Sequence, residues 1–280
     1  MNKKISVVAL DMDGTLFDNQ SSISKRNQDA IRSCTEKGIE IIISTGCPYV
    51  GLPIELLSKL GIHYAITANG AAIYTLPDKK CIYENCFSPD FLCPLLAKLQ
   101  EKEVHLDAFI DGDGYSMHSC AKRIDRLDMP ISIRSYIKAT RTLTDDLAAY
   151  IKKRNLSVQK AIVNFYPLAD GTFAHREEVK ALLASYPEIT FLSGGYHNLE
   201  FTKAGTTKGS GLLFLCGHLG ISPDETMAIG DTENDIDILQ TAAIGVAMGN
   251  ARTKVKEIAD FITLTNENDG VAHALEHFIP

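Results

Sequence analysis

The chain has 280 residues, 45% of them hydrophobic and 22% charged, which is the composition of an ordinary globular protein of about two domains. Its 28 Lys and Arg and 35 Asp and Glu residues give a formal net charge of −7, which disfavours a broad surface for nucleic acid or anionic lipid. Apolar runs such as Ile5–Leu10 are far shorter than the roughly 20 residues of a membrane span. We expect a cytoplasmic protein without a nucleic-acid or membrane partner.

The first quarter of the chain alternates strands with helices. Continuous apolar runs predict strands buried on both faces of a parallel sheet, and Ser24 and Gly38 bracket the first amphipathic helix as N-cap and stop. Short links between such elements are typical of a doubly wound α/β sheet. The expected strands cover residues 5–10, 39–43 and 65–67, and the expected helices cover 25–37 and 49–60.

Beyond about Tyr83 the pattern changes. Ser88 and Pro89 indicate the start of a helix, and the turn Asp111–Gly114 predicts a hairpin between strands over 106–110 and 115–118. Hairpins mixed with helices predict an α+β domain with an antiparallel sheet. Its other expected elements are helices over 145–153 and 177–186 and strands over 161–165 and 189–192.

From about Gly209 the first pattern returns, with helices over 212–219 and 235–241, strands over 226–229 and 244–246, and a final helix from about Gly270. The simplest organisation is one α/β core that an inserted domain interrupts. We therefore assign residues 1–82 and 191–280 to the core and residues 83–190 to the inserted α+β domain.

Polar residues follow the first core strand, at the end where open parallel sheets bind their ligands. Asp11-Met12-Asp13-Gly14-Thr15 combines two carboxylates with a turn whose amides can face an anion. An Asp-rich turn without chemistry is the alternative. An EF-hand is excluded, because Thr15 and Leu16 stand where a calcium loop needs a polar ligand and Gly.

Three further segments carry polar groups in the core. Ser44-Thr45-Gly46 offers hydroxyls after the second strand, although such residues are common in turns. Lys208 precedes the predicted 212–219 helix, and the order Lys-Gly excludes a P-loop; a surface lysine is the alternative. Gly230–Asp235 places carboxylates after the fourth core strand, where a helix cap at Asp231 or Thr232 is the alternative.

If Asp11, Asp13, Asp231 and Asp235 meet, each pair of like charges about 5 Å apart costs on the order of 3 kcal/mol at an effective dielectric constant near 20. A divalent cation relieves this repulsion, and oxygen ligands with waters and phosphate suit Mg²⁺. Carboxylate, metal and Lys208 together could transfer a phosphoryl group through an aspartyl-phosphate.

Taken in order, these four segments resemble the motifs of the haloacid dehalogenase superfamily of phosphohydrolases. The stretches over 67–71, 230–235 and 245–251 are more narrowly similar to the Cof-type branch, subfamily IIB. That resemblance implies a mostly parallel, Rossmann-like core with a cap domain inserted between the second and third motifs.

The resemblance also implies roles. Asp11 becomes the nucleophile, Asp13 the general acid and base, and Asp235 a support for the metal site or for Lys208. Mg²⁺ binds the Asp11 carboxylate, the Asp13 carbonyl and Asp231, while Asn69 and Gly70 shape the pocket. The residues that the resemblance implies for substrate or phosphate binding are Met12, Thr45, Gly46, Lys208 and Asn234.

One residue departs from the family pattern. The family often has arginine after Thr-Gly in its second motif, whereas Cys47 stands there in this chain. An arginine can contact substrate, so the change bears on which substrates are used, while the nucleophile, acid and metal ligands all remain. In the cap, the expected substrate contacts are Tyr115, His118, Asn164 and the turn over 194–197, which includes Tyr196 and His197.

We expect a Mg²⁺-dependent phosphatase that hydrolyses small phosphorylated metabolites, in the first place sugar phosphates and also phosphorylated cofactors, as a monomer or weak homodimer. Two alternatives stay open at this stage. A phosphomutase or phosphotransferase would replace water with another hydroxyl, and a regulator would bind the phosphometabolite without turnover.

Overall fold

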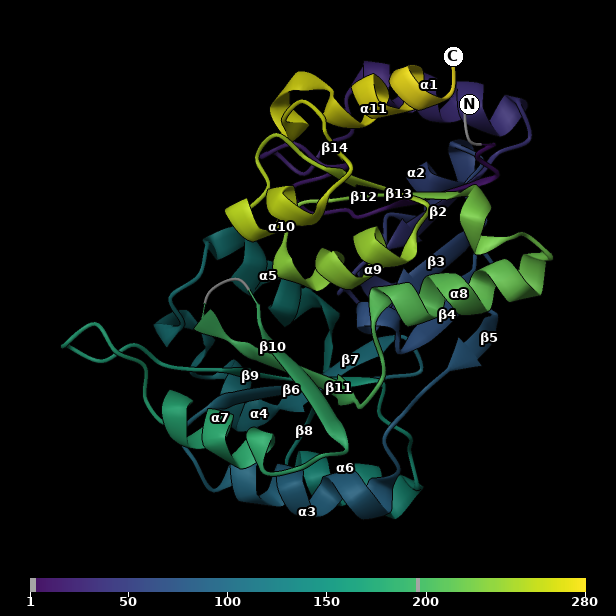
Figure 1. Cartoon of the computed structure of the whole chain (residues 1–280). Helices are drawn as coiled ribbons and strands as arrows, with labels where there is room; N and C mark the ends of the chain where they lie inside the picture. Colours follow the sequence, from purple (N-terminus) through teal and green to yellow (C-terminus); the bar gives the residue numbers. More distant parts are fainter. Residues whose placement is uncertain (1–3, 195–196) are drawn as a thin grey trace. The chain divides into compact units, whose positions relative to one another are not determined.

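The computed structural model describes residues 4–194 and 197–280, which form two compact units (Figure 1). The first unit holds the chain up to Cys47, Leu52–Tyr83 and Thr207–Pro280, and the second holds Pro48–Gly51 and Glu84–Thr206. Within the described ranges, no helix has both the length and the apolar character that crossing a membrane requires.

An eight-stranded sheet forms the centre of the first unit. β1 (Val7–Leu10) is fully buried and pairs in parallel with β2 (Glu40–Ser44) and β12 (Thr226–Gly230), one on each side. Beyond β2 the sheet continues with β3 (Tyr64–Thr67), β4 (Ala72–Thr75) and β5 (Cys81–Glu84), and beyond β12 with β13 (Ile244–Ala247) and β14 (Phe261–Ile262). β3 and β4 pair in the antiparallel direction, whereas the strands from β3 through β2, β1, β12 and β13 to β14 pair in parallel.

Helices cover both faces of this sheet. α1 (Lys25–Glu36) packs beside α11 (Gly270–Phe278), and α8 (Lys208–Leu219) packs beside α9 (Ile236–Thr241). Figure 1 shows the two pairs on opposite sides of the strands. The expected cap of α1 is confirmed, since the Ser24 side chain accepts a hydrogen bond from Asn27 N. The predicted doubly wound α/β architecture is therefore confirmed.

The second unit is built on a six-stranded sheet, in the order β10-β11-β9-β6-β7-β8, that is mostly antiparallel. One face packs against α3 (Pro89–Gln100), α6 (Leu147–Arg154) and α7 (Arg176–Ala184) through a common apolar core. Leu106 of β6 (His105–Ile110) and Val163 of β9 (Lys160–Asn164) belong to that core. The α+β character predicted for this part of the chain is confirmed.

Several predicted elements differ from the structure at their ends. The helix over 49–60 is a single turn at Tyr49–Gly51 followed by α2 (Ile54–Lys59), because Pro53 interrupts it. The hairpin turn is only Asp111 and Gly112, whose φ angles of 50° and 74° suit a two-residue turn, so β7 (Asp113–Met117) begins earlier than expected.

α8 begins at Lys208, four residues before its predicted start. Thr207 and Ser210 form a capping box there, in which each side chain bonds the other residue's backbone. Lys208 is thus the first helical residue.

The predicted domain boundary at residue 191 lies inside β10 (Ile189–Ser193). β10 pairs with β11 (Leu199–Lys203), and β11 pairs with β9, so the second sheet holds the chain as far as Thr206. β11 has no equivalent in the sequence prediction. Other elements absent from the prediction are α4 (His118–Ala121), α5 (Ile131–Thr140), β8 (Arg141–Thr144), α10 (Thr253–Ile258) and the strands β4, β5 and β14.

A buried ionic network lies within the sheet of the second unit. Asp107 Oδ2 accepts a hydrogen bond from Arg141 Nε at 3.1 Å, and Asp107 Oδ1 lies 3.0 Å from His105 Nε2. Burial raises the pKa of Asp107, but His105 and Arg141 outweigh it and hold the pKa below its usual range. The ionised carboxylate therefore stabilises the fold above its unfolded pKa of about 3.9, and this stabilisation is lost as the pH falls further.

Replacing Asp107 with Asn is expected to lower the free energy of unfolding by about 3 kcal/mol at pH 7, because Arg141 then stays buried without its counter-charge. Urea titration measures the loss, which should shrink below about pH 4. Asp125→Asn is the matched control, because Asp125 pairs with Lys138 on the surface and should change stability by less than about 1 kcal/mol. Equal losses in the two variants would contradict the assigned role of burial.

Candidate active site

The polar segments predicted at the strand ends meet in the first unit. β1, β2 and β12 are parallel neighbours, so Asp11, Thr45 and Asp231, which follow them, emerge at one edge of the sheet. Lys208 joins them: its Nζ lies 2.6 Å from Asp11 Oδ1 and 2.6 Å from Asp235 Oδ1. Residues 197 positions apart in the sequence are thus in direct contact.

Lys208 is a buried cation, with 1% of its surface exposed. Burial alone would lower its pKa, but Asp11 and Asp235 raise that pKa above the usual range. The lysine therefore stays protonated. A positive charge at the N-terminal end of α8 is unfavourable because of the helix dipole, and the two carboxylates compensate for it. This geometry excludes the surface-lysine alternative.

The carboxylates around Lys208 lie close to one another. Asp11, Asp231 and Asp235 each offer an oxygen within 4.8 Å of the others. Burial and then the charge of Asp235 raise the pKa of Asp11 well above its usual value, although Lys208 opposes the rise. The same two causes raise the pKa of Asp231 to about 6. Such a cluster gains from a divalent cation, which favours the ionised forms.

These carboxylates have different hydrogen-bond partners, which indicate different roles. Asp235 uses Oδ1 for Lys208, while its Oδ2 accepts from the backbone N–H groups of Asp231 and Thr232 at 3.0 Å each. Asp235 is therefore placed to orient Lys208 and the Asp231 loop. Asp11 and Asp231 are the better fit for a metal, and their hard oxygen donors are of the kind that Mg²⁺ prefers.

The turn over residues 13–15, called the Asp13 turn below, packs closely on Asp231. Gly14 has a φ of +82°, and a Cβ atom there would lie 2.5 Å from Asp231 Oδ2. Thr15 Oγ1 donates to Asp231 Oδ1 at 3.2 Å, and Asn250 Nδ2 donates to the Gly14 carbonyl at 2.7 Å. Glycine is required here because the backbone approaches the carboxylate directly.

Asp13 itself differs from its neighbours because its side chain is open to solvent. Partial loss of hydration raises the pKa of the Asp13 carboxyl, and the Lys208 charge and the Cys47 thiol oppose the rise. A carboxyl with a raised pKa is suited to donating a proton near neutral pH.

The Thr45 turn is fixed from two directions. Thr45 Oγ1 accepts a hydrogen bond from Cys47 N at 3.1 Å, which leaves its hydroxyl proton for another acceptor. The turn over Ala68–Gly70 donates to it through Ala68 N to Cys47 O and Asn69 N to Thr45 O, at 2.9 and 3.1 Å. Gly46 lies between Thr45 and Cys47, whose carbonyl groups accept these two hydrogen bonds.

Asn69 links this turn to the polar segment Gly230–Asp235. Its Oδ1 accepts a hydrogen bond from Asn234 Nδ2 at 3.2 Å, and Asn234 Oδ1 accepts from Thr232 Oγ1 at 2.6 Å. Gly70, with a φ of +97°, lies against α8, and a Cβ atom there would come within 2.0 Å of the Thr207 carbonyl. The Ala68–Gly70 turn therefore connects the Thr45, Lys208 and Asn234 segments.

Other predicted site residues lie in more ordinary surroundings. The Met12 side chain is buried in the core, so only its main chain can face a ligand. In the second unit, Tyr115 packs on the apolar core beside Tyr150, and Asn164 is buried on β9. His118 is exposed at the start of α4, and His197 is exposed with its ring stacked on Phe173. Tyr196 and Gly195 lie outside the described residues.

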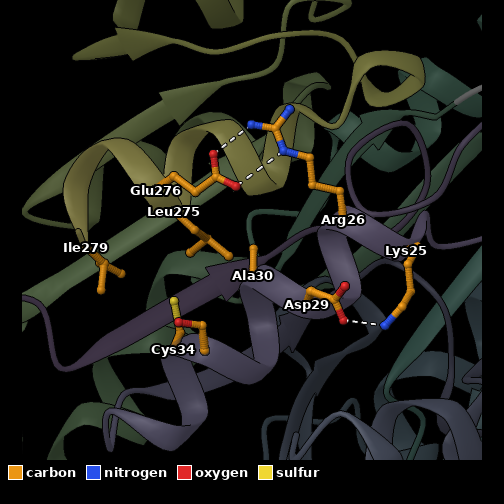
Figure 2. Close-up of a pocket in the computed structure, with 9 residues that line it drawn as sticks. Lys25, Arg26, Asp29, Ala30, Cys34, Leu275, Glu276 and Ile279 are labelled. Atoms are coloured by element: carbon orange, nitrogen blue, oxygen red, sulfur yellow. Dashed lines mark hydrogen bonds and ion pairs between the residues drawn. The ribbon is translucent and has the colours of Figure 1, made fainter.

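A groove of about 510 Å³ lies between α1 and α11, and Figure 2 shows residues that line it. Its charged residues pair with one another, Arg26 with Glu276 at 2.7 Å and Lys25 with Asp29 at 2.5 Å. Among the described residues that line it there is no strand-end aspartate and no Lys208. The groove therefore lacks the chemistry of the strand-end cluster.

The geometry agrees with a comparison to known families. Residues 8–275 match the sequence model of the haloacid dehalogenase-like hydrolases. The chain belongs to this family. The predicted resemblance is therefore confirmed, and the hydrolase is a phosphatase, in agreement with relatives that are named phosphatases.

Individual relatives match nearly the full length of this chain. It is 30% identical to the phosphatase YwpJ of Bacillus subtilis, over 98% of this chain and 100% of that protein. It is 29% identical to 5-amino-6-(5-phospho-D-ribitylamino)uracil phosphatase YcsE of the same organism, over 98% of this chain and 96% of the relative.

Solved structures give the same result. A haloacid dehalogenase-like hydrolase from B. subtilis superposes with a TM-score of 0.82 at 26% identity, over 98% of this chain and 99% of that one. The subclass IIB sugar phosphatase BT4131 gives 0.78 at 26% identity, over 98% of both chains.

Replacing Gly70 with Ala tests the contact between the Ala68–Gly70 turn and α8. The new Cβ would force the Thr207 carbonyl away and displace Lys208, so we expect a loss of at least about 2 kcal/mol in stability and reduced phosphatase activity. Gly38→Ala is the matched control, because Gly38 has a φ of +78° but no atom within 4 Å of such a Cβ. Similar losses in both variants would show that backbone strain, rather than the contact, is responsible.

Proposed function

We propose that this hydrolase is a Mg²⁺-dependent phosphatase of small phosphorylated metabolites, in the first place sugar phosphates, acting through an aspartyl-phosphate on Asp11. The observation that carries the proposal is Lys208 Nζ, held 2.6 Å from both Asp11 and Asp235 beside the Asp231 carboxylate. This arrangement combines a nucleophile with a fixed positive charge that can hold an anion next to it.

Three groups form the proposed phosphate seat. An ammonium group has three N–H donors, and Lys208 directs two of them to carboxylates, so the third supports a phosphate oxygen. The Thr45 hydroxyl supplies a second donor, since its oxygen already accepts from Cys47 N. The backbone of the turn after Met12 supplies the remaining contacts, because a tight turn can direct its N–H groups at an anion.

The proposed reaction has two steps. The Asp11 carboxylate attacks phosphorus, the ester P–O bond breaks, and Asp13 gives its proton to the departing oxygen. Asp13, now ionised, then takes a proton from the water that attacks the aspartyl-phosphate. Inorganic phosphate leaves and Asp11 is restored, so the chain ends each cycle unchanged.

The donor set fits a resident Mg²⁺ ion. The Asp11 and Asp231 carboxylates and the Asp13 carbonyl would hold it, while Asp235 stays with Lys208. Bound there, the ion would neutralise negative charge on the carboxylates and on the phosphoryl oxygens.

The substrate class rests on relatives and on the inserted unit. BT4131 is named a sugar phosphatase, and YcsE is named for a phosphorylated ribitylaminouracil, so polyhydroxylated leaving groups are common to both. That the second unit chooses among such leaving groups, through residues such as Asn164 or His118, stays a prediction.

Asp11→Asn is expected to reduce kcat for p-nitrophenyl phosphate by at least about 10³-fold, because an amide cannot act as the nucleophile. The variant should fold, since it removes a carboxyl whose pKa burial already raises. Asp29→Asn, on the exposed face of α1, is the control and should keep full activity. Equal rates in Asp11→Asn and the parent would refute the aspartyl-phosphate route.

Metal dependence should follow the protonation of Asp231. Its pKa of about 6 means that the carboxyl becomes neutral below that pH and then binds a cation poorly. We therefore expect chelation to abolish activity, Mg²⁺ to restore it, and the half-saturating Mg²⁺ concentration to rise about tenfold per pH unit below 6. Asp231→Asn should raise that concentration and flatten its pH dependence; an unchanged profile in this variant would argue against Asp231 as a ligand.

A further inference from the structure

Cys47 is the side chain next to Asp13 that the proposed reaction does not use. Its Sγ lies 3.9 Å from Asp13 Oδ2, and the residue is partly exposed. During the reaction the leaving oxygen must come within about 3.2 Å of the Asp13 carboxyl to receive its proton. Cys47 is therefore within about 7 Å of the leaving oxygen, close enough to affect which groups can be attached to it.

The position of Cys47 is fixed by its backbone. Cys47 N donates to Thr45 Oγ1 at 3.1 Å, and Cys47 O accepts from Ala68 N at 2.9 Å. The Asp13 turn is equally constrained, with Leu16 N bonded to Asp11 O at 3.2 Å. Two anchored turns thus hold the backbones of Cys47 and Asp13 in place, with the thiol and the carboxyl beside each other.

The charges around this position are unbalanced. The charge of Lys208 opposes the rise in the pKa of Asp13, but Lys208 already pairs with Asp11 and Asp235. Cys47 adds a neutral thiol where a cation would be needed to hold a second anion. Lys208 and the proposed metal offset the phosphate, and within the described part of the first unit no ion pair brings a further cation to Asp13.

We propose that Cys47 makes the site selective for phosphate monoesters whose leaving group is uncharged near the ester oxygen, such as polyols and sugars. Monoesters with a carboxylate or a second phosphate at that place are disfavoured, because their charge faces carboxylates without a counter-ion. This inference rests on the proposed function and identifies Cys47 as the residue that determines this part of the specificity.

A matched pair of substrates tests the proposal. Glycerol 2-phosphate and 2-phosphoglycerate differ only in that a hydroxymethyl group of the first is a carboxylate in the second. The readout is the ratio of their kcat/KM values, in which any general effect of a substitution on turnover cancels. The full-length parent with Mg²⁺ should favour glycerol 2-phosphate by at least about tenfold.

Three variants form a charge series at position 47. Cys47→Arg should lower the ratio at least about tenfold, and Cys47→Asp should raise it, because the charge changes sign. Cys47→Ser keeps a neutral donor of similar size and should leave the ratio within about twofold. If the Arg variant is inactive, the comparison of Asp with Ser still gives the sign of the effect.

Two outcomes would overturn the inference: a parent ratio near one, or a ratio that does not follow the charge at position 47. Hydrolysis of p-nitrophenyl phosphate by the same preparations separates this from a failure of the proposed function. If the parent lacks that activity, or if Asp11→Asn retains it, the function itself is wrong. If that activity is normal and the ratio is flat, only the role of Cys47 is wrong.

Discussion

The site depends on one buried ion pair network, in which Lys208 lies between Asp11 and Asp235. A buried ammonium is tolerated only with counter-charges, and buried carboxylates need a cation in the same way, so each member fixes the position of the others. The network also fixes larger elements, because Asp11 ends β1, Lys208 begins α8 and Asp235 supports the loop after β12. The same ion pairs therefore determine both the geometry of the site and the packing of the first unit.

Much of the fold could be predicted from the sequence, because continuous apolar strands and capped helices are local signals. β1, α1 and the alternation in the first unit have such signals. α5 does not: among its residues only Ile137 is buried, and several β-branched side chains weaken its helical pattern. β11, with the sequence Leu-Glu-Phe-Thr-Lys, alternates apolar and polar residues over only five positions, and this pattern does not reveal its pairing with β9 and β10.

The site was predictable to the extent that its residues follow strands. Asp11, Thr45 and Asp231 share this feature, and parallel pairing brings them together. Lys208 needed the resemblance to a family, since a lysine before a helix has no distinctive pattern of its own. The contacts of Thr15 with Asp231, of Asn250 with Gly14 and of Cys47 with Asp13 depend on loops that approach one another only in the folded chain.

The central place of β1 in its sheet has a consequence for how the chain is made. β1 is synthesised first, yet its neighbour β12 and the Lys208 counter-ion follow about two hundred residues later, after the whole inserted unit. While the chain emerges from the ribosome, the inserted unit can complete its own sheet before β12 is available to pair with β1. Asp11 therefore has no Lys208 partner until the segment after the inserted unit has been made, and until then the chain lacks the proposed phosphate site.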